Sequence, residues 1–103
     1  MDDVSRISRM GVQDKLASLA SLVGQAVVLD TEGHYVFLGQ LAEINEHYLI
    51  LENADVHDLR DTNSTREVYV LESRLHGIRA NRHRVLVRRD QVVSVSLLSD
   101  VVE

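Results

Sequence analysis

The sequence lacks cysteine altogether and has only four aromatic residues among its 103. A chain without thiols forms neither disulfides nor thiolate metal sites, and it fits a reducing compartment such as the cytoplasm. No apolar run approaches the roughly 18–20 residues that a membrane helix needs. The polar start, MDDVSRISRM, is unlike a signal peptide. We therefore expect a cytoplasmic protein without membrane contact.

The motifs of catalysis and cofactor binding are also missing. The chain has no G-x-S-x-G elbow, no P-loop and no G-x-G-x-x-G. Asp55, His57, Asp58 and Asp61 lie close together, but Arg66 stands where a calcium loop starting at Asp61 needs glycine, and no two histidines are spaced i, i+4. We expect no enzyme, no cofactor and no metal.

The residues that are present favour strands. With few aromatics, the core must be built from Val, Leu and Ile, and β-branched Val is especially common towards the C-terminus. The length suits one domain with one modest core. We predict a mainly β protein with a flexible tail over residues 1–11 and a single domain over 12–103.

Local patterns place the first half of the elements. Apolar residues spaced three and four apart from Val12 to Val23 predict a helix, and Gly24 is placed to end it. Alternating and β-branched stretches predict strands over 25–30, 34–44 and 48–52, joined by short turns. The polar residues 53–63 predict a surface loop.

A second helix and two strands are predicted after this loop. Ser64 and Glu67 have the spacing of a capping box, and Gly77 is placed to end the helix. Apolar residues at helical spacing follow the box: Val68, Leu71, Leu75 and Ile78. We predict a helix over 65–76, then strands over 82–88 and 91–98 that form a hairpin around Arg89-Asp90.

The last two strands are apolar without a regular alternation. Val85-Leu86-Val87 and Val92-Val93 place apolar side chains on both faces of their strands. A strand with one face in water should alternate, so both faces are expected to be covered. A partner subunit could provide that cover and also pair with the strand edge.

Charge is distributed unevenly along the chain. Residues 1–65 carry 11 acidic and 4 basic residues, whereas residues 66–90 carry 7 arginines and 3 acidic residues. The overall charge of −5 argues against general binding of polyanions. The basic segment could still contact a phosphate backbone, or its arginines could simply lie on solvated faces.

The order of these elements resembles the Sm-like fold. The first Sm segment is similar to residues 22–29 (LVGQAVVL), followed by Gly33, Gly39, Asn45 and residues 49–51. The second is similar to residues 87–95 (VRRDQVVSV), with Arg89 at the position of the family's glycine. The resemblance spans residues 12–98. It implies a five-stranded Sm-like (SH3-like) barrel with an N-terminal helix and a helical insertion between strands 3 and 4, with a PRC-barrel as the second choice.

The resemblance also implies a function. Sm-like proteins form rings in which the turns after the second and fourth strands line a pore that binds single-stranded RNA. Carried over by position, it places Asn45 near a base edge, His47 in a stacking role, and Arg88 with Arg89 as the cations. The alternative is a self-assembling structural or protein-interaction barrel, Sm-like or PRC-barrel-like, that binds no nucleic acid.

Overall fold

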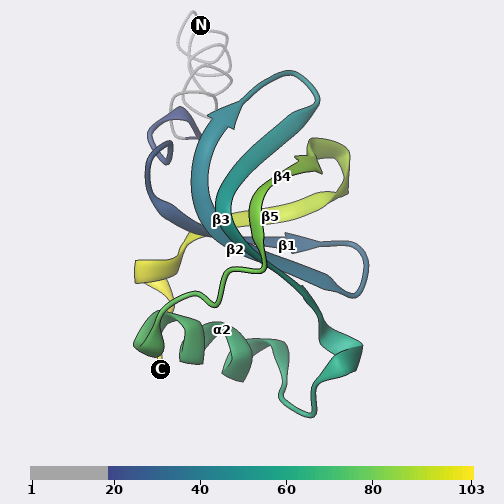
Figure 1. The fold of residues 1–103 in the computed structure, drawn as a ribbon, viewed down its shortest axis with the longest axis vertical. Helices are drawn as coiled ribbons and strands as arrows, with labels where there is room; N and C mark the ends of the chain where they lie inside the picture. The colour runs from purple at the N-terminus through teal and green to yellow at the C-terminus, as the bar shows by residue number, and fades with distance from the viewer. Residues whose placement is uncertain (1–18) are drawn as a thin grey trace, which may run out of the picture.

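A computed structural model describes residues 19–103 as one bent antiparallel sheet with a helix packed across it (Figure 1). The strands are β1 (Ala26–Thr31), β2 (Tyr35–Ile44), β3 (Tyr48–Asp58), β4 (Arg82–Arg88) and β5 (Val92–Leu97). The helix is α2 (Arg66–His76), and three 3-10 turns are η1 (Leu59–Asp61), η2 (Arg89–Gln91) and η3 (Leu98–Asp100). The expected mainly β fold with a helix between strands 3 and 4 is therefore confirmed. The expected tail over 1–11 and most of the helix expected over 12–23 lie outside the described residues.

The loop predicted over residues 53–63 is wrong for its first half. β3 continues to Asp58 and pairs with β2 along its whole length, up to the partners Tyr35 and Asp58. The polar composition of this stretch suggested a loop, but a bulge keeps it in the sheet. Asn53 adopts a positive φ of 48°, and the residue after it, Ala54, is fully buried.

The predicted hairpin of the last two strands is also wrong. The strand order is β4-β3-β2-β1-β5, so β4 pairs with β3, and β5 pairs with β1. The turn η2 carries the chain from one edge of the sheet to the other instead of folding it back on itself. Within residues 19–103 no pairing joins β4 to β5, so the expected barrel is an open sheet with two free edges.

Both faces of the sheet are covered by apolar side chains. Along β1, Val27 and Leu29 belong to a core cluster with Leu41, whereas Val28 points to the other face. Val28 packs in a second cluster that includes Val70 of α2 and Leu98 of η3. The inserted helix and the C-terminal turn therefore cover the face of the sheet opposite the main core.

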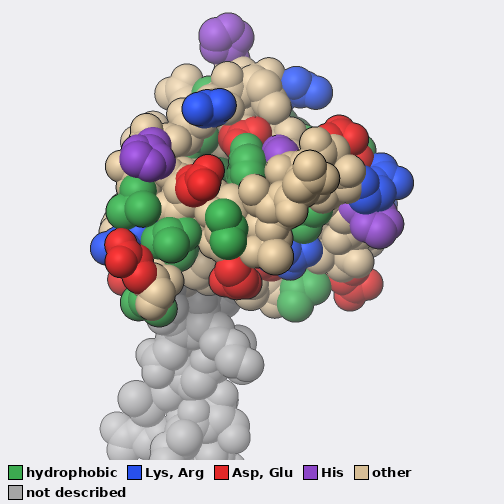
Figure 2. Space-filling model, turned by 90° about the horizontal axis from the view of Figure 1, so that it is seen from below, with side chains coloured by type: hydrophobic (Ala, Val, Ile, Leu, Met, Phe, Trp, Pro, Cys, Tyr) green, Lys and Arg blue, Asp and Glu red, His purple; other side chains and the backbone are tan. Residues whose placement is uncertain are grey.

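The helix α2 begins and ends close to the predicted positions. The side chain of Thr65, one residue after the expected capping residue, accepts the Val68 N–H, and Gly77 ends the helix with a φ of 92°. The apolar spacing that identifies the helix, however, is not the face that it buries. Val70 and Ser73 are buried, while Val68 and Leu75 are 45% and 52% exposed. Seen from the α2 end, exposed apolar side chains are interspersed with acidic ones (Figure 2).

A polar network at Asp55 fixes this orientation of α2. The Asp55 carboxylate is buried, and it accepts hydrogen bonds from the Tyr69 hydroxyl and from Nδ2 of Asn81. Asn81 also hydrogen-bonds both the N–H and the carbonyl of Val56, so its carboxamide pairs with β3 as a neighbouring strand would. Burial and the bond to Asp55 raise the pKa of Tyr69 well above its usual range. The phenol therefore remains a donor at ordinary pH.

Gly39 is where β2 passes closest to β3, opposite the bulge. A Cβ atom at this position would lie 3.1 Å from Ala54 and 3.1 Å from the carbonyl oxygen of Glu52. We expect Gly39→Val to lower the free energy of unfolding by about 1–3 kcal/mol because the two strands must separate. Urea denaturation measures this change. Gly33→Ala is the matched control, since nothing lies within 4 Å of its Cβ position; equal midpoints for the two variants would contradict the prediction.

Candidate nucleic-acid interface

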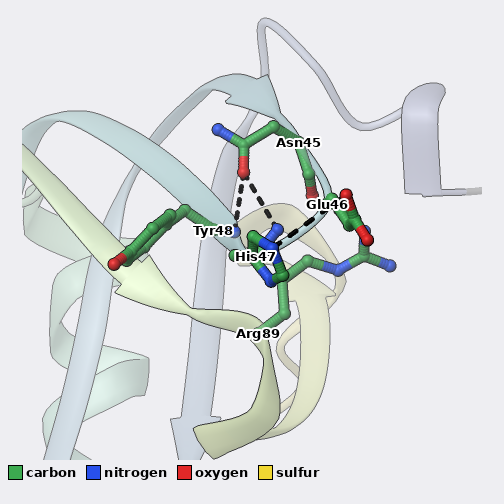
Figure 3. A network of polar contacts seen from close by, with 5 residues as sticks. All are labelled: Asn45, Glu46, His47, Tyr48 and Arg89. Atoms are coloured by element: carbon green, nitrogen blue, oxygen red, sulfur yellow. Dashed lines mark hydrogen bonds and ion pairs between the residues drawn. The ribbon is translucent and has the colours of Figure 1, made fainter.

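The turn between β2 and β3 is built by the side chain of Asn45. Its Oδ1 accepts the backbone N–H groups of His47 and Tyr48, at 3.0 and 2.9 Å (Figure 3). This is the local bonding for which Asn is favoured in turns. Because Oδ1 is already occupied by two donors, Nδ2 is the part of the carboxamide that remains for a base edge.

Arg89, directly after β4, forms two hydrogen bonds with this turn. Its backbone N–H donates to the carbonyl of His47 at 2.8 Å, and its guanidinium donates to the carbonyl of Asn45 at 2.9 Å. Residues 88–91 all have negative φ, so the 3-10 turn does not require the glycine that the Sm-like pattern has at Arg89. The arginine therefore replaces glycine without backbone strain and gains a bond across the two turns.

The two other predicted side chains point into solvent beside acidic neighbours. Arg88 forms an ion pair of 2.7 Å with Asp90, and Nε2 of His47 lies 4.0 Å from the carboxylate of Glu46. The side chains of this second pair are 76% and 89% exposed, so the contact is weak and the imidazole remains accessible.

The two turns together form an open cleft of about 550 Å³. Its lining residues are Glu46, His47, Tyr48, Arg88, Arg89 and Asp90. Asn45 does not line the cleft, but its side chain holds the turn that carries His47 and Tyr48. Imidazole and guanidinium can stack on bases, and guanidinium also binds phosphate. The cleft thus contains three of the four predicted residues, His47, Arg88 and Arg89, together with two carboxylates, and Asn45 lies in the adjoining turn.

Tyr48 is a lining residue that the sequence analysis did not select. It directly follows the turn, and an aromatic residue at that position is the only sequence signal that could have identified it. Arg82 and Arg84 do not line the cleft. Arg82 donates to the carbonyl of Asn81, and Arg84 lies 3.9 Å from Glu43.

The acidic stretch around Asp55 does not form a metal site in the described residues. No group of three or more His, Asp or Glu side chains between residues 19 and 103 is arranged to hold a metal ion. Asp55 faces the Tyr69 hydroxyl, and Asp58 binds Arg60 at 2.7 Å. Bonding to Arg60 lowers the pKa of Asp58 to about 2. In the same part of the chain, no helix has the length and apolarity to span a membrane.

Comparisons with known proteins identify the fold. No family model and no curated protein matches the sequence. Among solved structures, the chain is similar to a Pyrococcus abyssii Sm protein in complex with a uridine heptamer, with a TM-score of 0.56 and 15% sequence identity. The similarity covers 80% of this chain and 94% of the Sm protein. The expectation from the sequence is confirmed at the level of the fold: this chain has the Sm-like fold.

Proposed function

We propose that this protein assembles into a homo-oligomeric ring and binds single-stranded RNA at the cleft between the two turns. The observation that carries the proposal is the convergence of His47, Arg88 and Arg89 from two separate turns into one open cleft, with Asn45 bonded to Arg89 beside it. The Sm-like neighbour was solved with a uridine heptamer. In a ring, the same cleft would recur once per subunit around the pore.

The two free edges of the sheet support ring assembly. Among residues 19–103, β4 pairs only with β3 and β5 pairs only with β1, so each has a row of unpaired backbone groups on its outer side. Both edges also expose apolar side chains, since Leu86 of β4 is 51% exposed and Val93 of β5 is 66% exposed. Pairing β4 of one copy with β5 of the next continues the sheet. Because the two surfaces differ, repeated pairing leads to a closed ring when the rotation permits.

The chemistry of the cleft supports RNA as the ligand. The exposed His47 ring can stack on a base, Nδ2 of Asn45 can donate to a base acceptor, and the arginines can contact phosphate. Glu46 and Asp90 oppose this role because they place negative charge beside the phosphate path. These two carboxylates favour the second candidate function, a self-assembling structural or interaction module without nucleic acid.

Titration of labelled U-rich and A-rich oligoribonucleotides separates the two functions. We expect His47→Ala and Arg88→Ala each to weaken binding by roughly tenfold, the effect of losing one stacking or charged contact. Affinity should also fall steeply between low and moderate salt. Arg74→Ala is the control because Arg74 lies on α2, away from this cleft, and its loss should change little. Absent binding, or binding equally affected by all three substitutions, would leave the assembly module as the function.

A further inference from the structure

A second cleft, of about 310 Å³, lies between α2 and the end of β3. Residues of α2 line this cleft, and α2 lies at the opposite end of the molecule from the β2–β3 turn (Figure 1). Its ionisable lining residues are His57, Tyr69, Glu72, His76 and Arg79. Histidine, arginine and acidic side chains lie on the face seen from this end (Figure 2). None of these residues belongs to the candidate RNA site.

The His57 ring is held in one position at the base of this cleft. It stacks on Tyr69 with ring centroids 3.7 Å apart and planes at 11°, and Tyr69 is itself bound to Asp55. Nε2 of His57 is buried and has no hydrogen-bond partner. A buried N–H without a partner costs more than a buried ring nitrogen without a proton. Nε2 is therefore closed to a ligand, and Nδ1 is the ring nitrogen that can donate to one.

Arg79 supplies a fixed positive charge at the same cleft. Within residues 19–103 it makes no ion pair, although it lies near enough to the Tyr69 phenol to oppose the rise in its pKa. His76 likewise has no acidic partner in this part of the chain. Three lining side chains, His57, His76 and Arg79, can thus donate hydrogen bonds to an anion, and Arg79 is permanently charged.

We propose that this cleft binds a phosphate monoester. The Arg79 guanidinium can form paired hydrogen bonds with two phosphate oxygens, and His57 and His76 can donate to the remaining one. A phosphate monoester offers three acceptor oxygens at the end of one bond, whereas a carboxylate offers only two. The ligand has room for a substituent, because the cleft of about 310 Å³ is larger than a phosphate group. It is either a free phosphorylated small molecule or the 5′-phosphate of an RNA.

Glu72 allows a test in which two substitutions should change the binding affinity in opposite directions. It is exposed, makes no ion pair within the described residues, and faces the same cleft as Arg79. A carboxylate beside a bound phosphate repels it, so Glu72 limits the affinity. Removing this charge should strengthen binding, whereas removing the charge of Arg79 should weaken it.

Isothermal titration with inorganic phosphate and with 5′-UMP tests these expectations on the full chain. Relative to the unchanged protein, Arg79→Gln should weaken binding on the order of tenfold, and Glu72→Gln should strengthen it a few-fold. Arg74→Gln is the control because Arg74 lies on the same helix but does not line the cleft. No binding at millimolar ligand, or equal losses for Arg79→Gln and Arg74→Gln, would overturn the proposal.

A pair of oligoribonucleotides of one sequence, one 5′-phosphorylated and one with a 5′-hydroxyl, identifies the source of the phosphate. Tighter binding of the phosphorylated form, lost in Arg79→Gln, assigns the cleft to an RNA end. Equal binding of both oligonucleotides, together with binding of 5′-UMP, assigns it to a free phosphorylated molecule. The comparison does not depend on the cleft at His47, because both oligonucleotides present the same bases to it.

Discussion

Val93→Lys is expected to convert the proposed ring into folded monomers. Val93 is 66% exposed on β5, at the point where the pairing of β5 with β1 shifts register. In the proposed ring this side chain is buried against β4 of the next copy. A lysine there must lose its hydration without gaining an acidic partner, which costs several kcal/mol per junction. Multi-angle light scattering at micromolar concentration measures the loss of assembly.

Two other valines serve as controls for this substitution. Val95 packs against the main core from inside the sheet, so Val95→Lys should unfold the chain instead of merely dissociating it. Val102 is 84% exposed beyond the last strand, and Val102→Lys should leave the assembly intact. A protein that is already a monomer without any substitution would refute the ring.

Mixing two edge variants provides a sharper test of how the copies join. Val93→Lys blocks the β5 edge, and Leu86→Lys blocks the β4 edge, where Leu86 is 51% exposed. Each variant alone should be monomeric. Their mixture retains one intact junction, between β4 of the first and β5 of the second, so a heterodimer and nothing larger should form. Rings in the mixture would mean that other surfaces hold the copies together.

Elements that depend on local chemistry could be predicted from the sequence. The positive φ of Gly24 and Gly77, and the hydroxyl cap of α2, follow from residues within one turn of each other. The pairing of β1 with β2 also depends on residues close together in the sequence, because a tight turn at Gly33 joins two apolar segments. Such local signals do not depend on where the segment lies in the fold.

The predictions that the structure contradicts depend on contacts between segments far apart in the sequence. β3 extends past Glu52 because it keeps pairing with β2 beyond the bulge, and Asn81, far along the chain, also bonds to Val56 through its side chain. α2 buries Val70 and Ser73 because Tyr69 is held by Asp55, whereas helical spacing alone favoured the face of Val68. Periodicity identifies a helix but cannot choose its rotation when a buried polar bond competes with apolar contact.

The two clefts also differ in how far they could be predicted from the sequence. Each cleft residue selected from the resemblance lies within a few residues of a turn, so its position follows once the fold is known. The residues of the second cleft come from β3, from α2 and from the segment after it. They meet only because the helix has the observed rotation. No sequence pattern relates His57 to Arg79.

Asp55→Ala is expected to cause the largest loss of stability among the polar substitutions. The carboxylate is 3% exposed and receives hydrogen bonds from Tyr69 and Asn81, which belong to two segments packed on β3. Its removal leaves the Tyr69 hydroxyl without its acceptor and leaves Asn81 with only its bonds to Val56. We therefore expect the free energy of unfolding to fall by about 2–4 kcal/mol. Urea denaturation in the Val93→Lys background measures this without a contribution from assembly.

Tyr69→Phe and the double variant show whether the loss comes from this network. Tyr69→Phe removes one donor and should cost about 1–2 kcal/mol. If the two groups act together, the double variant should be less destabilised than the sum of the single ones. Glu52→Ala is the control, since Glu52 is an exposed acid on the same strand. Additive losses, or an equal loss in Glu52→Ala, would contradict the network.

Burial of Tyr69 and its bond to Asp55 give the stability of the fold a pH dependence at the alkaline end. The pKa of Tyr69 is raised in the folded chain, so the folded state favours the protonated phenol. Its contribution to stability is therefore complete below about pH 10, the usual pKa of tyrosine, and is lost as the pH rises further. Tyr69→Phe has no proton to lose and should not show this component. The difference in the free energy of unfolding between the unchanged protein and Tyr69→Phe should therefore become smaller above pH 10.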